Sequence, residues 1–303
     1  MVSVIVCTRN RADILADCLR SLTDQDDGST PYEIVVVDNG SSDGTAAMVE
    51  ALARDDERVR YVSEPRIGLS CARNAGARAA RFEYLAYLDD DGHVDPTFIG
   101  VVRRVIEEHA FACFGGWVTP VFRTPKPAWL PQSFGYYKKW SDRTTALTAG
   151  QDLPGGIFIV KQAALTRCGG FPEGIGMRGS SIGYGEENVV QQKLRKQGNT
   201  IGFCPDLVLH HLVAEYKFSV VWHLKRQFAL ARDRRSLRRP LRRREVAWAF
   251  ARGILLPLPL LCANARRFFG PTTYYWQNWL LDSLKEPLRA LGAAVASTAR
   301  RAA

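Results

Sequence analysis

The sequence predicts an α/β protein with a mostly parallel sheet flanked by helices, followed by a helical C-terminal appendage. Two observations carry this prediction. Over the first hundred residues, short β-branched runs alternate with segments whose apolar residues recur at helical spacing. After residue 216 the charge balance changes sharply. Because neighbouring parallel strands need a crossover connection, the alternation favours a sheet with helices on its faces.

The N-terminal elements follow in strand–helix order. Residues 2–7 and 33–38 are β-branched runs typical of buried strands, and residues 12–22 place apolar side chains at helical spacing. The next turn is rich in Gly, Ser and Asp, and we expect Ser42 or Asp43 to cap the helix that follows.

A further repeat of this pattern ends in an acidic run. The sequence predicts a strand at 59–64, a helix at about 69–81 and a strand at 84–88 immediately before DDDG. Open α/β sheets bind ligands at the carboxyl ends of their strands, so residues that follow strands are the first candidates for a site.

The second part of the chain is less regular. Residues 111–122 look like strands, whereas 124–140 is rich in Pro and aromatic residues and predicts a long loop. Regular structure resumes over 155–168. A helix is expected at 186–197 and a long strand at 200–213.

Composition and charge limit the function classes. The 303 residues are 46% hydrophobic and 24% charged, which excludes a mainly disordered chain. Residues 1–216 hold 23 basic and 27 acidic side chains, a net −4, whereas 217–303 hold 18 and 4, a net +14. Nucleic acid, an anionic membrane surface and an acidic polymer are the open partners for the basic part.

Several common site types are not expected. The seven cysteines are odd in number and form no CxxC pair, so neither a disulfide framework nor a zinc site is predicted. No GxxxxGK[ST] motif is present, and GIGMRG at 174–179 follows no predicted strand. The N-terminal residues lack the features of a signal peptide, and we expect a reducing, cytoplasmic location.

Three adjacent carboxylates, Asp89, Asp90 and Asp91, follow the strand at 84–88. Because like charges at this spacing repel, a divalent cation is the economical explanation, and oxygen ligands favour Mg²⁺ or Mn²⁺. The alternative is a solvated acidic turn. Asp38 ends an earlier strand in the same way, which favours a ligand site at this edge of the sheet.

Four motifs, in order and spacing, resemble those of the nucleotide-sugar glycosyltransferases of family 2, which have the GT-A fold: VSVIVCTRNR, EIVVVDNGSSDGT, GLSCARNAG and YLAYLDDDG. The match covers about residues 1–212. The resemblance implies a GT-A catalytic domain over 1–216, with a nucleotide-binding half at 1–110 and an acceptor-binding half at 111–216. Residues 217–303 would form the appendage.

The resemblance also implies a nucleotide site. Thr8 and Arg9 would begin the nucleotide pocket, Asp38 would hydrogen-bond the base and Arg73 would lie close to the nucleotide. For each there is a structural alternative: an ordinary loop for Thr8 and Arg9, a helix cap or turn for Asp38, and a surface helix position for Arg73.

The acidic run would be the family's DxD motif. Asp91 would be the direct metal ligand, Asp89 would lie nearer the ribose or the metal, and Asp90 would belong to the nucleotide-sugar site. The expected cofactor is Mg²⁺ or Mn²⁺, with a nucleotide sugar as co-substrate.

A second acidic site opens the predicted helix at 186–197. Glu186 and Glu187 stand where the helix dipole favours negative charge, so a purely structural role is one interpretation. In the family this pair is usually Glu-Asp, and its second member is the base of inverting enzymes. Glu187 is therefore the candidate base and Glu186 an acceptor-binding neighbour, but the Glu-Glu pair leaves the choice between them open.

Two histidines follow the apolar residues of the last predicted strand. His210 and His211 point to opposite faces, so that one of them can reach the metal or the diphosphate while the other packs or faces solvent. The sequence leaves open which one does so, and a structural role for both is the alternative.

Acceptor-binding residues are predicted more weakly. Trp129 lies in the aromatic loop at 124–140, which is suited to stack on sugar rings, to move as a lid or simply to pack. Asp152, Gly155 and Gly156 lie where the resemblance places an acceptor-side loop.

The basic appendage combines arginines with an apolar run. Residues 246–263 have one internal charge, Arg252, and two prolines, and are marginal as a membrane span. They fit an interfacial or re-entrant segment beside anionic lipids. The alternative is a helix buried against the catalytic domain. RNA is less favoured because the arginines lead into aliphatic residues.

Together these features predict a metal-dependent, inverting glycosyltransferase. It would move a sugar from a nucleotide-sugar donor, with UDP favoured, to a hydroxyl of a glycan or lipid-linked acceptor in cell-surface polysaccharide or glycolipid synthesis. It would act as a peripheral or monotopic protein at the inner face of the plasma membrane. The alternative is a non-catalytic nucleotide-binding protein whose basic tail tethers RNA or membrane. The sugar, the acceptor and the oligomeric state stay open.

Overall fold

The computed structural model describes residues 1–26, 30–179, 181–236, 241–270 and 272–302. These residues form two compact units whose segments interleave along the chain. The sheet unit comprises Met1–Val121, Gly135–Gly174 and Glu186–Leu212, and the helical unit comprises Phe122–Phe134, Ile175–Gly185 and Val213–Ala303. The sequence analysis instead divides the chain once, at residue 216.

The sheet unit contains a mixed sheet with nine strands among the described residues. In the order β3-β2-β1-β4-β8-β6-β9-β5, the first four strands are parallel, and β7 pairs with β9. β8 runs antiparallel to both β4 and β6, and β9 is parallel to β6. The strands are β1 (Val2–Thr8), β2 (Tyr32–Asp38), β3 (Val59–Ser63), β4 (Tyr84–Asp89), β5 (Gly92–Val94), β6 (Cys113–Val121), β7 (Thr145–Ala146), β8 (Ile157–Lys161) and β9 (Ile201–Leu212).

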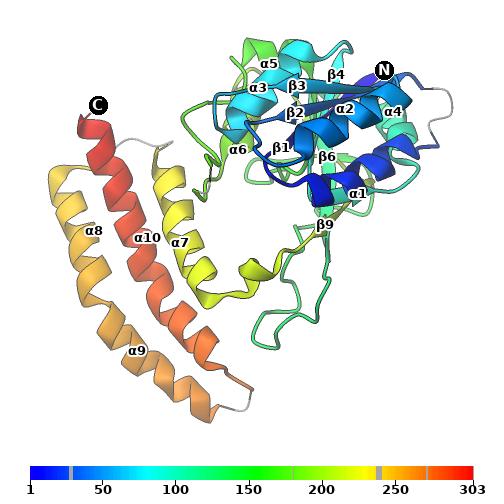
Figure 1. The fold of residues 1–303 in the computed structure, drawn as a ribbon. Coiled ribbons are helices and arrows are strands. Elements are labelled where there is room, and N and C mark those ends of the chain that lie inside the picture. The colour runs from blue at the N-terminus through cyan, green and yellow to red at the C-terminus, as the bar shows by residue number, and fades with distance from the viewer. Residues whose placement is uncertain (27–29, 180, 237–240, 271, 303) are drawn as a thin grey trace. The chain divides into compact units, whose positions relative to one another are not determined.

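Helices cover both faces of this sheet (Figure 1). One apolar cluster joins α1, α2 and α4 to one face, and a second joins α3, α5 and α6 to the other. Alternation along the strands supplies both clusters. The helices are α1 (Ala12–Thr23), α2 (Thr45–Asp55), α3 (Leu69–Ala79), α4 (Phe98–Glu108), α5 (Gln162–Arg167) and α6 (Glu186–Lys196).

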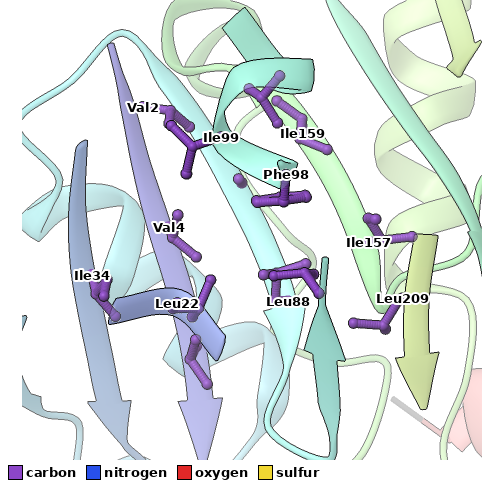
Figure 2. Packing of buried hydrophobic residues seen from close by; sticks show 14 of the residues in the cluster. Val2, Val4, Leu22, Ile34, Leu88, Phe98, Ile99, Ile157, Ile159 and Leu209 are labelled. Atoms are coloured by element: carbon purple, nitrogen blue, oxygen red, sulfur yellow. The ribbon is translucent and has the colours of Figure 1, made fainter. Parts of the chain in front are cut away.

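Figure 2 shows the first of these clusters from close by. Val2 and Val4 of β1 lie beside Ile34 of β2, and Phe98 and Ile99 of α4 point into the same layer. In contrast, Ile5, one residue along β1, belongs to the cluster on the other face. The three-layer α/β architecture predicted from the alternating runs is thus confirmed.

The parallel register brings the ends of three strands together. Thr8 is the register partner of Asp38, and Cys7 is the register partner of Asp89. The carboxyl ends of β1, β2 and β4 therefore lie at one edge of the sheet, which is where an open α/β sheet places its ligand.

Most predicted elements lie within two residues of the observed ones, but several details differ. α4, the three-residue strand β5 and the two-residue strand β7 were not expected from the sequence. At the start of α2 the N-cap is Gly44, not Ser42 or Asp43 as predicted. Asp43 still takes part in this turn, since its Oδ1 accepts a hydrogen bond from the Thr45 backbone N–H at 3.0 Å.

The helical unit is built around one long helix, α10 (Trp276–Ala302). α7 (Val220–Ser236) packs along one side of α10, and α8 (Arg243–Leu255) and α9 (Pro257–Ala265) pack along another (Figure 1). Short 3₁₀ segments, η1 (Glu215–Phe218) and η2 (Arg266–Phe269), follow β9 and α9.

The apolar segment at 246–263 spans two helices, α8 and α9. Pro257 begins the second helix, and the pair Arg243–Leu255 and Pro257–Phe269 is bent by 43°. Among the described residues no single helix is long and apolar enough to cross a membrane, although this bent pair passes that test of length and composition when taken together.

Candidate active site

The acidic run lies where β4 ends and β5 begins. Asp89 is the last residue of β4, and β5 pairs antiparallel with β9 so that Gly92 is the register partner of His211. The Leu212 N–H donates to the Asp91 carbonyl at 2.7 Å. The short strand β5 thereby fixes a histidine of β9 beside the aspartates.

Asp89, Asp91 and His211 form a group with the geometry of a metal site. One ligand atom from each lies within 4.8 Å of the others. His211 Nε2 is 3.2 Å from Asp91 Oδ1. Two carboxylates and one imidazole converging in this way fit a divalent cation that prefers oxygen ligands.

The two histidines have different surroundings. His210 Nε2 lies 3.0 Å from Asp95 Oδ1, and its Nδ1 lies 3.0 Å from Thr119 Oγ1. Its ring also stacks on His93. Of the two, the structure brings His211 to the aspartates and gives His210 other partners, as strand alternation requires.

Arg11 is a neighbour of the aspartates that the sequence analysis missed. Its Nη1 lies 2.8 Å from Asp90 Oδ1 and 3.1 Å from Asp91 Oδ2. Burial raises the pKa of Asp90 to about 6, while Arg11 opposes this shift. The sequence held a signal for this contact: three adjacent carboxylates need a compensating positive charge, and Arg11 supplies one.

Arg73 of α3 connects the acidic run to the glutamates of α6. Its Nη1 is 2.8 Å from Glu186 Oε1, and its Nη2 is 3.6 Å from Asp89 Oδ1. Nη2 also donates to the Gly155 carbonyl at 3.1 Å. Burial alone would lower the pKa of Arg73, but the negative charges of Glu186 and Asp89 outweigh this effect. The pKa of Arg73 is therefore raised, and the guanidinium stays charged. Arg73 is a buried residue and not a surface helix position.

The two glutamates at the start of α6 differ in their burial and in their hydrogen-bond partners. Glu186 is buried and ion-paired with Arg73. Glu187 is half-buried, and its Oε1 accepts a hydrogen bond from Asn188 Nδ2 at 3.2 Å. Burial, together with the charge of Glu186, raises the pKa of Glu187 to about 8, against the opposing charge of Arg73. The carboxylate form of a group with this pKa is a stronger base than an ordinary carboxylate.

Gly155 and Gly156 pass between these groups. A Cβ at Gly156 would lie 2.6 Å from Asp89 Oδ2, and one at Gly155 would lie 3.2 Å from Arg73 Nη2 and 3.4 Å from Glu187 Cδ. The Asp89 N–H donates to the Gly156 carbonyl at 3.2 Å. Both glycines are thus part of the same cluster as the aspartates and glutamates.

The predicted nucleotide residues lie at the ends of β1 and β2. Thr8 and Asp38 are both buried. Asp38 Oδ1 accepts from the Ser41 N–H at 2.8 Å, and Oδ2 accepts from the Tyr61 hydroxyl at 3.0 Å. Arg9 Nε lies 3.4 Å from the Gly40 carbonyl. Asp38 therefore holds the turn after β2, and this local role is compatible with a ligand at the same edge.

The other predicted acceptor residues have structural partners. Asp152 forms an ion pair with Arg195 at 2.6 Å. Trp129 belongs to the helical unit and is buried there, edge-on to His223, and its carbonyl accepts from Asn278 Nδ2 at 2.8 Å. Neither residue is a member of the cluster around Asp89 and Arg73, and their acceptor role stays a prediction.

Comparison with known proteins decides the family. The family model described as "Glycosyl transferase family 2" matches residues 3–173, more than half of the chain. The chain belongs to this family. The resemblance found in the four sequence motifs is thereby confirmed.

Curated relatives of this family 2 glycosyltransferase differ in their sequence identity to it and in how much of each chain the match covers. "Uncharacterized glycosyltransferase EpsJ" of Bacillus subtilis is 29% identical over 145 residues, 48% of this chain and 36% of that protein. "Glucosyl-dolichyl phosphate glucuronosyltransferase" of Haloferax volcanii is 23% identical over 233 residues, 75% of this chain and 74% of that protein. The chain spans about a third of the length of the first relatives it matches.

Solved structures agree on the fold. The mannosyltransferase PcManGT from Pyrobaculum calidifontis, in complex with GDP-Man and Mn²⁺, matches with a TM-score of 0.59 at 19% identity, over 98% of this chain and 86% of that one. Residues 1–349 of S. aureus TarS, in complex with UDP-GlcNAc, match with a TM-score of 0.58 at 18% identity, over 99% and 91%. The fold is that of the GT-A glycosyltransferases.

Proposed function

We propose that this family 2 glycosyltransferase is a metal-dependent, inverting enzyme. It transfers a sugar from a nucleotide-sugar donor to a hydroxyl of a glycan or lipid-linked acceptor in cell-surface polysaccharide or glycolipid synthesis. One observation carries the proposal: Asp89, which groups with Asp91 and His211, and the carboxyl group of Glu187 border the same pair of glycines, Gly155 and Gly156. A cation site and a proton acceptor side by side are what displacement of a diphosphate by a hydroxyl requires.

The metal ligands in this proposal are Asp91, Asp89 and His211. They would hold a Mg²⁺ or Mn²⁺ ion, which when bound neutralises the charge of the diphosphate leaving group. Arg11 and Arg73 add fixed positive charge beside these carboxylates. Thr8, Arg9, Asp38 and Asp90, at the same edge of the sheet, are the proposed nucleotide-binding residues.

The base in this proposal is Glu187. Glu186 is held by Arg73 and buried, whereas the pKa of Glu187, raised to about 8 chiefly by burial, suits proton transfer from the acceptor hydroxyl. As Glu187 takes the proton, the hydroxyl oxygen bonds to the anomeric carbon and the bond to the diphosphate breaks. A single displacement of this kind inverts the anomeric configuration.

The donor nucleotide is proposed to be uridine, with guanosine and thymidine as the alternatives. Support for a nucleotide-sugar donor comes from the solved neighbours, one in complex with GDP-Man and another with UDP-GlcNAc. A lipid-linked acceptor has support in the Haloferax relative, a glucosyl-dolichyl phosphate glucuronosyltransferase.

The metal assignment is tested with Asp91→Asn. Donor hydrolysis across a panel of nucleotide sugars, with Mn²⁺, Mg²⁺ or a chelator, is expected to need the metal and to be lost in this variant. The matched control is Asp95→Asn, an exposed aspartate next to β5. Full activity of Asp91→Asn would contradict the metal assignment. If nucleoside diphosphates do not stabilise the unaltered protein in a metal-dependent way, a non-catalytic binding protein is favoured instead. The anomer formed, read by NMR, tests inversion.

We also propose that residues 217–303 attach the enzyme peripherally to the cytoplasmic face of the plasma membrane. The support is their net charge of +14, since anionic lipids contribute about 1 kcal/mol for each nearby Lys or Arg. Nucleic acid is the less favoured partner because the arginines adjoin aliphatic residues rather than stacking platforms.

A further inference from the structure

The helices α8 and α9 and the segment η2 carry large apolar side chains in contact with solvent. Trp248 is 62% exposed, Leu255 69%, Leu258 71% and Phe269 93%. These residues and Ile254 are called the apolar face. Within α8, Trp248 and Leu255 are seven residues apart and lie on the same side of the helix, and Leu258 and Phe269 continue the exposed apolar residues into α9 and η2. Monomeric proteins rarely expose contiguous apolar surface of this kind without a partner.

The other side of the bent pair is fastened to α10. Gly253 is buried, and a Cβ there would lie 2.4 Å from Leu291 Cγ, so the α8 backbone contacts α10 closely. Trp279 Nε1 donates to the Leu261 carbonyl at 2.8 Å, and Asn264 Nδ2 donates to Ser283 Oγ at 3.1 Å. The apolar face is therefore the outward side of helices already packed in the helical unit.

Positive charge borders the apolar face. Between residues 243 and 269 the sequence holds five arginines and one acidic residue, Glu245. The guanidinium of Arg252 lies over the ring of Trp248, 4.8 Å from its centroid. The remaining arginines stand at the two ends of the stretch, at positions 243, 244, 266 and 267.

This arrangement discriminates between possible partners. A second copy of this chain would bring arginine against arginine, with Glu245 as the sole acidic residue in the stretch to offset them. An anionic bilayer offers both an apolar interior for the side chains and negative headgroups for the rim.

We propose that the apolar face binds the surface of an anionic lipid bilayer, with α8 and α9 lying in the headgroup region and not spanning the bilayer. This inference rests on the proposed membrane attachment and specifies its surface. α8 alone has 13 residues, about 20 Å of helix, which is shorter than a hydrocarbon core of about 30 Å, and its continuation in Pro257–Phe269 turns away by 43°. The contacts with α10 occupy the opposite side of both helices.

Flotation of the full chain with vesicles tests the surface. We expect binding to vesicles of equal parts phosphatidylcholine and phosphatidylglycerol, weaker binding at high salt, and little binding to phosphatidylcholine alone. Leu255→Ser with Leu258→Ser is expected to lower partitioning about tenfold or more. The matched control is Val221→Ser on α7, 57% exposed in the unaltered chain, which is expected to bind as the unaltered chain does.

Charge and depth are tested separately. Arg243→Gln, Arg244→Gln and Arg266→Gln together are expected to lower binding to the anionic vesicles by about two orders of magnitude. Cys262 of α9 is exposed, whereas the other six cysteines are buried or half-buried, so a thiol-reactive environment-sensitive dye reports on α9. Its emission is expected to shift to the blue when anionic vesicles are added.

Several outcomes would overturn the inference. These are absence of flotation with the anionic vesicles, flotation unchanged by the Leu255 and Leu258 substitutions, self-association that is lost in that variant, or RNA binding that survives where vesicle binding does not. Hydrolysis of a soluble nucleotide sugar is measured alongside. Normal hydrolysis without flotation would contradict only the proposed membrane-binding surface. Normal flotation without hydrolysis would contradict only the proposed reaction.

Discussion

Arg73 is a buried cation that holds together residues far apart in the chain. It pairs with Glu186 and lies 3.6 Å from Asp89, and it donates to the Gly155 carbonyl. A buried ion pair adds little net stability compared with apolar residues, but breaking it by removing one partner leaves an uncompensated charge. Its main role here is positional, because one guanidinium fixes the places of two carboxylates and one backbone carbonyl.

Arg73→Met is expected to lower the free energy of unfolding by about 3–5 kcal/mol, because Glu186 is left buried without a counter-charge. Adding Glu186→Gln is expected to recover part of this loss. Urea unfolding of the two single variants and the double variant measures the coupling. For comparison, Arg20→Met breaks the exposed pair with Asp17 and is expected to cost about 1 kcal/mol or less. Additive losses in the Arg73 cycle would contradict the described pairing.

The raised pKa of Glu187 predicts the pH dependence of transfer. The base must be deprotonated, so kcat/KM is expected to fall about tenfold for each pH unit below the pKa of Glu187 and to level off above it. That pKa is raised to about 8 in the metal-free protein, and a bound cation is expected to lower it from there. Steady-state rates with saturating metal check this profile. Glu187→Gln is expected to keep donor binding and lose transfer at every pH. If Glu186→Gln has that effect instead, the base is the neighbouring residue.

The same group affects stability with the opposite sign. A native pKa of about 8, above the ordinary 4.5 of the unfolded chain, stabilises the fold fully below pH 4.5, and this contribution is lost as the pH rises through 8. Between pH 5 and 8 the unaltered chain is therefore expected to lose thermal stability relative to Glu187→Gln. Parallel melting curves of the two chains without metal would contradict the shift.

At the scale of elements, the loop before β8 brings backbone, not side chains, to the cluster. Gly156→Ala places a Cβ 2.6 Å from Asp89 Oδ2, and the Asp89 side chain is 38% exposed, so the carboxylate is expected to turn away while the fold persists. Donor hydrolysis is expected to fall about 10–100-fold, the usual effect of disturbing a metal ligand from outside its coordination shell. The control is Gly174→Ala, where a Cβ meets nothing within 4 Å. Melting temperature and metal titration separate a lost ligand from a lost fold.

The elements that the sequence predicts well are those with a local signal. The strands β1, β2 and β4 have continuous apolar runs, and their shared edge follows from parallel pairing. α4 could have been predicted in the same way, because its apolar residues recur at helical spacing: Phe98, Ile99, Val102 and Val105. β5 has three residues and exists because β9 pairs with it, so nothing in its own composition predicts it.

The residues of the candidate site also fall into those that the sequence predicts and those that only the tertiary structure identifies. The carboxylates could be named from their places after strands. The choice of His211 over His210, the pairing of Glu186 with Arg73 across 113 positions and the contact of Arg11 with Asp90 all depend on tertiary structure. A single sequence predicts residue types at an edge, but not which of two neighbours faces inward.

At the scale of the whole molecule, the two units are interleaved and not consecutive. The segments 122–134 and 175–185 leave the sheet unit and belong to the helical unit. Within that unit the Tyr184 N–H donates to Asp233 Oδ2 at 2.9 Å, and Trp129 is bonded to Asn278. A boundary drawn at residue 216 therefore separates these segments from their partners.

A chain that ends at residue 216 is accordingly expected to be less stable than the full chain, because Trp129 and Tyr184 lose their packing. A lower melting temperature and increased binding of a hydrophobic dye are the expected readouts. The matched control is the full chain with Asn278→Ala, which removes one of these bonds and is expected to cost about 1 kcal/mol. Equal melting temperatures for the truncated and full chains would contradict the interleaved division.

The glycine pair at 155 and 156 also matters to anyone who wishes to change what this enzyme accepts. The main chain at these two positions lies against Asp89, Arg73 and Glu187, and a Cβ at either position would press on one of these side chains. A library that randomises this pair is therefore expected to contain mostly variants with weakened activity. A library that keeps both glycines leaves these contacts unchanged, and so suits a search for altered selectivity in other side chains around the site.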